Sequence, residues 1–164
     1  MKTQEEKTSE MKERSSVAER NKELVRRAVK EIWNDGNYDD LEEFVSRDIT
    51  IYLATPETQI QGLEGVKEFY VQLRNAFPDI HFTIDSQIAE EDKVVTQWTA
   101  RGTHKGPFRG IAPTGKRIRL VSVDIDRIVD GKAVECWANM DELGLLRQLG
   151  VIEEDGERLG INKG

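Results

Sequence analysis

A hairpin in the last third of the chain constrains the fold more than any other feature. Residues 117–129 alternate in character as a half-buried strand does, and residues 132–138 form a second short strand after Asp130-Gly131. An Asp-Gly pair between two strands is a strong signal for a tight two-residue turn. The two segments are therefore predicted to pair antiparallel.

Two more strands precede this hairpin and extend it into a meander. The first carries Ile80, Phe82, Ile84 and Ile88 on one predicted face, and the second carries Val94, Trp98 and Ala100. Glu91-Asp92 supplies the turn between them, and the Gly/Pro-punctuated residues 102–116 make a long connection to the hairpin. A shorter alternating segment at residues 49–53 predicts one strand earlier in the chain.

The N-terminal half is predicted to hold three helices. Ser16 and Glu19 form a possible capping box, after which apolar residues recur at helical spacing up to Trp33. A short second helix would bury Leu41, Phe44 and Val45, and a third helix ends before Pro78. Helix, helix, strand, helix and then an antiparallel meander is the order of an α+β domain with helices packed on one face of a sheet.

Length and composition favour one domain. The 164 residues suit a single core, which we assign to residues 15–152. Residues 1–14 are polar and charged and are expected to be disordered, and residues 153–164 form a polar tail with little to bury.

Charge and cysteine content bear on partners and location. The net charge of −7, with no Lys/Arg cluster in the sequence, argues against a nucleic-acid partner. No apolar run approaches the roughly 20 residues of a membrane span. The single cysteine, Cys136, excludes an internal disulfide and fits the cytoplasm. The two histidines lie far apart in the sequence and show no metal-ligand spacing, so no metal site is expected.

Two segments resemble a known family. GTHKGPFRGIAPTGK at residues 102–116 and GKAVECWANMDELGLLRQLG at residues 131–150 are similar to the SnoaL-like polyketide and ester cyclases of the nuclear-transport-factor-2-like superfamily. The resemblance implies a cone-shaped α+β barrel in which three N-terminal helices pack inside a strongly curved antiparallel sheet, with a ligand cavity at the open end and a short C-terminal helix. It also implies cofactor-free chemistry.

The resemblance directs attention to three positions. Ala138 stands where the cyclases carry an acid/base aspartate. Asp124, two residues after Ser122, stands where they carry a histidine, which makes it the candidate acid/base. Asp141 matches a second family aspartate at the start of the terminal helix, where an aspartate is at least as well suited to capping the helix as to chemistry.

Two interpretations of residues 117–129 stay open at this point. Alternation without the family places Val121, Val123 and Ile125 in the core and leaves the face of Asp124 in solvent. The resemblance implies the reverse, with Asp124 in the cavity. The exposed valine face would then mark an interface, and homodimerisation through the outer sheet face is expected.

The predicted cavity residues carry different expectations. Trp33 and Trp98 are expected in the core or the cavity wall. His104 is expected at the rim as a hydrogen-bonding residue, and Cys136 is expected to point inward as a structural residue. The complete predicted lining is Trp33, Trp98, His104, Leu120, Ser122, Cys136 and Ala138.

Three functions agree with these observations. The first is a cofactor-free cyclase or isomerase acting on a hydrophobic carbonyl compound by acid-base catalysis. The second is a non-catalytic protein that binds a small hydrophobic molecule, which the alanine at position 138 supports. The third is a dimeric protein-interaction module, which would need an apolar outer sheet face and no usable cavity.

Overall fold

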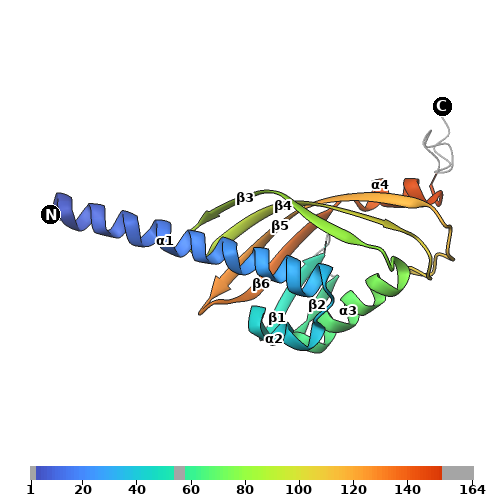
Figure 1. Ribbon diagram of the computed structural model, residues 1–164, viewed down its shortest axis with the longest axis horizontal. Coiled ribbons are helices and arrows are strands. Elements are labelled where there is room, and N and C mark those ends of the chain that lie inside the picture. Colours follow the sequence, from blue (N-terminus) through green and yellow to red (C-terminus); the bar gives the residue numbers. More distant parts are fainter. Residues whose placement is uncertain (1–2, 54–57, 153–164) are drawn as a thin grey trace, which may run out of the picture.

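A curved, unclosed sheet of six strands wraps around the helices of an α+β domain (Figure 1). The computed structural model describes residues 3–53 and 58–152. The strand order across the sheet is β2-β1-β6-β5-β4-β3. The elements are α1 (Gln4–Ala28), a π-helical turn (Val29–Asn34), a 3-10 turn (Tyr38–Asp40), α2 (Leu41–Phe44), β1 (Val45–Leu53), β2 (Gln59–Gln61), α3 (Gly62–Ala76), β3 (His81–Glu90), β4 (Lys93–Thr103), β5 (Arg117–Val129), β6 (Lys132–Met140) and α4 (Glu142–Leu149).

The predicted C-terminal hairpin is confirmed. Asp130 and Gly131 both have positive φ angles, of 50° and 75°, as a two-residue hairpin turn requires. Val129 pairs with Lys132 beside the turn, and β4 pairs with β5 along the whole length of β4. The predicted antiparallel sheet needs one correction, because β1 pairs parallel with β6. A parallel pair requires a long crossover, and here the crossover is all of α3 and the meander.

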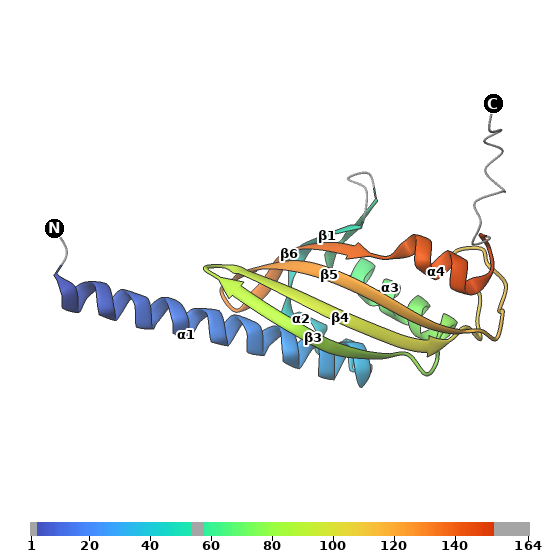
Figure 2. The same cartoon turned by 90° about the horizontal axis from the view of Figure 1, so that it is seen from above.

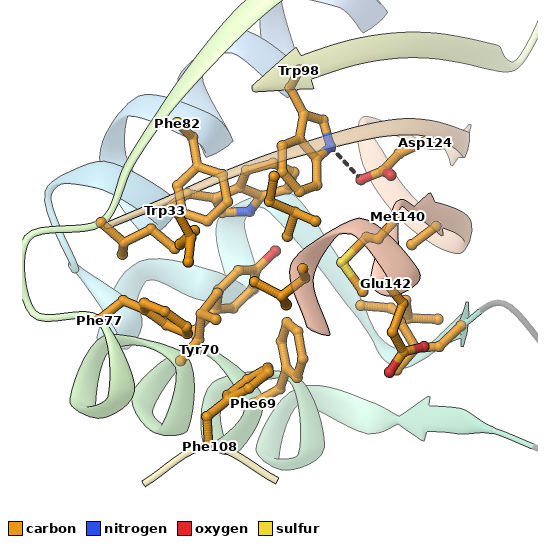
Figure 3. A pocket seen from close by; sticks show the side chains of 18 of the residues that line it. Trp33, Phe69, Tyr70, Phe77, Phe82, Trp98, Phe108, Asp124, Met140 and Glu142 are labelled. Carbon is orange, nitrogen blue, oxygen red and sulfur yellow. Dashed lines mark hydrogen bonds between the residues drawn. The ribbon is translucent and has the colours of Figure 1, made fainter. Parts of the chain in front are cut away.

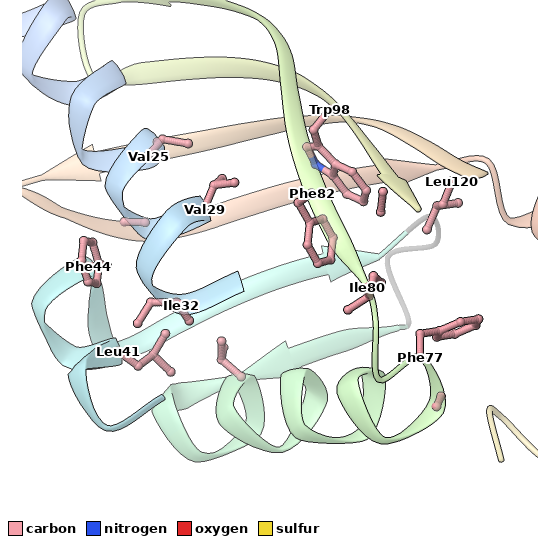
Figure 4. Packing of buried hydrophobic residues seen from close by; sticks show 14 of the residues in the cluster. Val25, Val29, Ile32, Leu41, Phe44, Phe77, Ile80, Phe82, Trp98 and Leu120 are labelled. Atoms are coloured by element: carbon pink, nitrogen blue, oxygen red, sulfur yellow. The ribbon is translucent and has the colours of Figure 1, made fainter. Parts of the chain in front are cut away.

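The core lies between the helices and the concave face of the sheet (Figure 4). Val25, Val29 and Ile32 project from α1 and the π-helical turn at helical spacing, and each is nearly or fully buried. They face aromatic and aliphatic side chains from α2 and the sheet, of which Phe44 is 1% exposed. Val45, expected in the second helix, instead begins β1 and is only partly buried.

Residues 4–14, expected to be disordered, form the first turns of α1, which projects from the body (Figure 2). Thr3 and Glu6 form the capping box that was expected at Ser16 and Glu19. This reciprocal cap satisfies two backbone N–H groups that would otherwise have no intrahelical partner. Local helix chemistry therefore orders a segment that buries almost nothing. The predicted tail at 153–164 lies outside the described residues.

A bulge in β3 overturns one predicted core position. The register between β3 and β4 shifts between Ile84 and Ser86. A bulge inserts one residue and reverses which side chains face inward beyond it. Ile88 was expected on the buried face with Phe82, but it is 70% exposed, while the neighbouring Ala89 packs against the core.

Because the bulge turns Ile88 outward, an apolar row extends across the outer face of the sheet. Direct register partners link Ile88 to Val95, Val95 to Ile125, Ile125 to Trp137 and Trp137 to Tyr52. The rings of Tyr52 and Trp137 stack with centroids 5.5 Å apart. We refer to these five residues as the outer apolar row. Val123, on the same face of β5, is 40% exposed.

The chain contains no membrane-spanning helix within residues 3–53 and 58–152, since none there combines sufficient length with sufficient apolar character.

Candidate functional site

An apolar cavity opens at the end of the domain where α3, α4 and the long β4–β5 connection meet (Figure 3). Its interior volume is about 70 Å³, which is small beside the roughly 300–1,000 Å³ of pockets that hold drug-sized ligands. The lining is almost entirely aromatic and aliphatic. It comprises Trp33, Ile51, Leu53, Phe69, Tyr70, Leu73, Phe77, Ile80, Phe82, Trp98, Phe108, Arg109, Ile118, Leu120, Asp124, Cys136, Ala138, Met140, Glu142 and Leu145.

Asp124 is the carboxylate in the wall of this cavity. Alternation along β5 turns it inward with Leu120 and Ser122, and it is only 5% exposed. The indole Nε1 of Trp98 donates a 2.7 Å hydrogen bond to one carboxylate oxygen, and the Ser122 hydroxyl donates a 2.6 Å bond to the other. Both donors come from neighbouring positions in the sheet, so the carboxylate is held rigidly.

Burial controls the protonation of this group. Loss of solvent raises the pKa of Asp124 from 3.8 to about 6, although the hydrogen bonds from Ser122 and Trp98 oppose the rise. A carboxylate with a pKa near 6 is mostly ionised at pH 7 and is more basic than an exposed aspartate. It is therefore suited to accepting a proton from a weakly acidic carbon.

A second interior carboxylate lies two residues further along β5. Burial, followed by the nearby charge of Asp124, raises the pKa of Asp126 to about 7. Cys136, its register partner on β6, lies within hydrogen-bonding reach, and burial raises the pKa of that thiol well above its ordinary value. A buried thiol with a raised pKa is a poor nucleophile.

Asp126 lines a smaller chamber that shares part of its wall with the main cavity. The chamber has a volume of about 60 Å³. Trp33, Ile51, Tyr70 and Cys136 line both spaces.

Ala138 lies directly across from Asp124. The two residues are register partners on β6 and β5, and both line the cavity. Directly opposed residues in an antiparallel pair have Cβ atoms about 4.5–5.5 Å apart. The position where the cyclases carry an aspartate and the position of Asp124 here thus open onto the same part of the cavity.

The structure separates the predicted cavity residues into two groups. Trp33, Trp98, Leu120, Cys136 and Ala138 belong to the lining, and Trp33 and Trp98 meet edge to face at 5.8 Å. Ser122 does not line the cavity, because its buried side chain lies behind Asp124 and binds it.

His104 lies outside the lining as well. It is 0% exposed and packs behind the lining residue Phe77, with ring centroids 5.1 Å apart. Its Nδ1 accepts a 3.2 Å hydrogen bond from the Thr114 backbone N–H and lies 3.1 Å from the Thr114 hydroxyl. His104 therefore anchors the long β4–β5 connection through Thr114. It does not lie at the cavity rim, where it was expected.

Asp141 caps α4 and is not part of the cavity. Its carboxylate accepts a 2.9 Å hydrogen bond from the backbone N–H of Gly144, and the residue is exposed. The next residue, Glu142, reaches the cavity mouth and forms an ion pair with Arg109 from the long loop. The rim therefore carries a charged pair that joins two elements.

Sequence reasoning missed several residues of the mouth and lining. Tyr70 lies on α3, and its hydroxyl points into the cavity (Figure 3). Phe108 and Arg109 lie in the long loop, where no periodicity indicates which side chains turn inward.

Fold and cavity together define a class of small α+β domains in which a curved sheet encloses an apolar cavity with a buried carboxylate in its wall. The model of the SnoaL-like polyketide cyclase family matches residues 23–149, and the chain belongs to that family. It is 32% identical over 130 residues to aklanonic acid methyl ester cyclase DnrD of Streptomyces peucetius, covering 78% of this chain and 89% of the relative. It is also 32% identical over 123 residues to nogalonic acid methyl ester cyclase of Streptomyces nogalater, covering 72% and 89%.

The solved structure of a candidate SnoaL-like polyketide cyclase from Jannaschia sp. CCS1 superposes with a TM-score of 0.76 at 25% identity. The superposition covers 82% of this chain and 94% of that one.

Proposed function

We propose that the protein is a cofactor-independent cyclase or isomerase that acts on a hydrophobic carbonyl compound, with Asp124 as the acid/base. The observation that carries the proposal is the buried carboxylate held by Trp98 and Ser122 in a cavity whose interior is lined mainly by aromatic and aliphatic side chains. Two relatives that are 32% identical are named as cyclases of aklanonic acid methyl ester and of nogalonic acid methyl ester, and we extend this class of methyl ester substrates to this chain.

The proposed ring closure is an intramolecular aldol reaction. Asp124 takes a proton from a carbon activated by neighbouring carbonyl groups, and the electron pair of that C–H bond becomes an enolate. The enolate carbon then forms a bond to a second carbonyl carbon of the same molecule, whose C=O π electrons move to oxygen. The protonated Asp124 returns its proton to that alkoxide, so no net proton is gained or lost.

The location of the base distinguishes this chain from the cyclase pattern. The carboxylate stands on β5 at position 124 instead of on β6 at position 138, across a single register pair. Because both positions open onto the same part of the cavity, a base on either strand addresses the same region of a bound ligand.

A second candidate function is binding without turnover. Ala138 and the small interior volume of about 70 Å³ favour it, since pockets for drug-sized ligands have volumes of roughly 300–1,000 Å³. In that case Asp124 accepts a hydrogen bond from the ligand instead of taking a proton from carbon.

The deciding experiment uses the two esters named by the relatives. The purified protein is incubated with aklanonic acid methyl ester and with nogalonic acid methyl ester, and ring closure is followed by chromatography and mass spectrometry. Turnover by the wild type that falls at least about a hundredfold in Asp124→Asn supports catalysis. The control Asp130→Asn removes a carboxylate from the hairpin turn and should leave turnover unchanged, because Asn-Gly suits the same turn.

Binding of either ester without turnover would instead support the second candidate. Turnover that survives Asp124→Asn would show that another group is the base.

We also propose that the protein is a cytoplasmic homodimer joined through the outer sheet face. The apolar Val121, Val123 and Ile125 of β5 support this assembly, and the outer apolar row continues them across four neighbouring strands. A contiguous, partly exposed apolar surface of this kind is typical of an interface.

A further inference from the structure

A cluster of arginines lies on the outer face of the sheet. The cavity lies on the other face of the same sheet. Arg101 on β4 is the direct register partner of Arg119 on β5. Arg117 lies two residues before Arg119 and therefore shares its face. Each of these three residues is exposed, and we name them the arginine triad. His81 on β3, the register partner of Arg101 on its other side, extends the cluster to a third strand.

This arrangement is unfavourable for the fold alone. Like charges directly opposite each other in a sheet destabilise it. Among the residues the structure describes, no carboxylate forms an ion pair with any member of the triad. The chain has a net charge of −7, so acidic partners are plentiful elsewhere on its surface.

The triad borders a depression that differs from the cavity in chemistry. Its volume is about 390 Å³, and it is lined by Asp79, His81, Thr83, Arg101, Gly102, Thr103, Arg117 and Ile118. Arg119 stands beside this lining, opposite Arg101. Gly102 contributes only backbone to this lining, because a side chain at that position would point inward against Phe77 and Ile80.

One acidic residue belongs to the lining, and its carboxylate is already engaged. One oxygen of Asp79 accepts a 2.6 Å hydrogen bond from the Thr103 backbone N–H, and the other accepts a 2.7 Å bond from the Thr103 hydroxyl. These two hydrogen bonds lower the pKa of the Asp79 carboxyl and hold the carboxylate close to Thr103. The guanidinium groups of Arg101 and Arg117 are left without this partner.

The backbone that carries the cluster is fixed in place. The Gln148 side chain of α4 accepts a 2.7 Å hydrogen bond from the Arg119 N–H and donates a 3.0 Å bond to the Arg119 carbonyl. Gln148 thus replaces a neighbouring strand at this point, because β6 pairs with β5 only from Ser122 onward. The spacing of the arginines is therefore set by the sheet.

We propose that the arginine triad and His81 form a binding site for a soluble phosphate-bearing ligand, a phosphate ester or a diphosphate. Neighbouring strands lie about 4.8 Å apart, so guanidinium groups from two strands can reach one anion together. A phosphate group offers three acceptor oxygens and accepts bidentate hydrogen bonds from arginine, whereas a carboxylate offers two. The ligand binds outside the cavity, so this site is independent of the proposed cyclase chemistry.

The test is a titration of the full chain with sodium pyrophosphate at low and moderate salt, followed by amide NMR shifts and by calorimetry. Shifts should concentrate at His81, Arg101 and residues 117–119. The double variant Arg101→Gln/Arg117→Gln should weaken binding at least about tenfold. Arg26→Gln, which removes one exposed charge from α1, is the control and should leave the affinity unchanged.

Thermal melting provides a readout that separates binding from folding. Without ligand, the double variant should melt at the same temperature as the wild type or higher, since like-charge repulsion is relieved. Pyrophosphate should raise the melting temperature of the wild type but not that of the variant.

Three results would overturn the proposal. The first is the absence of localised shifts with pyrophosphate, and the second is equal affinity in the double variant and the wild type. The third is binding of an acidic peptide such as hexaglutamate where pyrophosphate does not bind, since that would assign the triad to a protein partner.

Discussion

Asp124 and Trp98 are joined across two strands by a 2.7 Å hydrogen bond, from the indole Nε1 to a carboxylate oxygen. The bond connects Trp98, the one aromatic residue of β4, to the only acidic residue of β5 that lines the main cavity among the described residues. Since Ser122 occupies the other oxygen, the carboxylate is fixed in orientation before any ligand arrives. A fixed base avoids part of the reorganisation that a mobile one would require.

The pKa of Asp124 should respond to its two donors. Carbon-detected NMR titration of the wild type should give a pKa of about 6. Ser122→Ala and Trp98→Phe should each raise it further, because each removes a hydrogen bond that favours the charged form. An Asp124 pKa near 4 in the wild type would show that the carboxylate is solvated, contrary to the structure.

Stability should decrease as the pH rises through this pKa. The folded-state pKa of about 6 lies above the ordinary value of 3.8, so the folded protein holds the proton more tightly than the unfolded chain. The contribution of Asp124 to the free energy of unfolding is therefore full below about pH 4. Its loss by about pH 7 lowers that free energy by about 3 kcal/mol. Denaturant unfolding should show Asp124→Asn gaining stability relative to wild type across that interval, whereas Asp130→Asn should show no such trend.

Moving the carboxylate from position 124 to its register partner, position 138, should restore turnover. Asp124→Asn alone should be inactive on a substrate that the wild type converts. The double variant Asp124→Asn/Ala138→Asp should regain at least about a tenth of the rate, since positions 124 and 138 are opposed on the cavity wall. Single-turnover kinetics on the three proteins measures this. A double variant as inactive as Asp124→Asn would show that the two positions are not interchangeable.

The proposed dimer should depend on the centre of the outer sheet face. Light scattering should find a homodimer for the wild type, and Val123→Glu should yield monomers because it places two like charges near the two-fold axis. Leu143→Glu is the control, since this 50% exposed residue of α4 lies away from that face. A monomeric wild type would contradict the assembly.

The projecting part of α1 should be dispensable for stability. Removing residues 1–13 deletes helix that buries little, and the Arg14–Glu91 ion pair beyond it is exposed. The melting temperature should stay within a few degrees of the wild type, while the far-UV helical signal falls. A larger decrease would show that the projection packs against another surface.

The sequence pattern predicted the hairpin and the helical stripes because periodicity follows directly from which face is buried. The pattern could not decide which face of β5 is buried. One face carries Val121, Val123 and Ile125, and the other carries Ser122 and Asp124. Hydrophobicity favours burying the valines. The polar side chains lie inside because Ser122 and Trp98 satisfy the Asp124 oxygens, and such partners are invisible in a one-strand pattern.

Two other features escaped prediction for a related reason. The bulge near Asp85 that exposes Ile88 depends on how β3 registers with β4. The arginine triad depends on the pairing of β4 with β5, so no run of basic residues in the chain reveals its full extent.

The parallel pairing of β1 with β6 has a consequence for how the chain is made. Residues 45–53 leave the ribosome well before their partners at 133–138 have been synthesised. With an interval on the order of 80 residues and synthesis at roughly 5–20 residues per second, the nascent chain waits several seconds with the far edge of β1 unpaired. During that wait α1 and α3 have no finished concave surface to cover, so this domain completes its folding only once almost the whole chain has emerged.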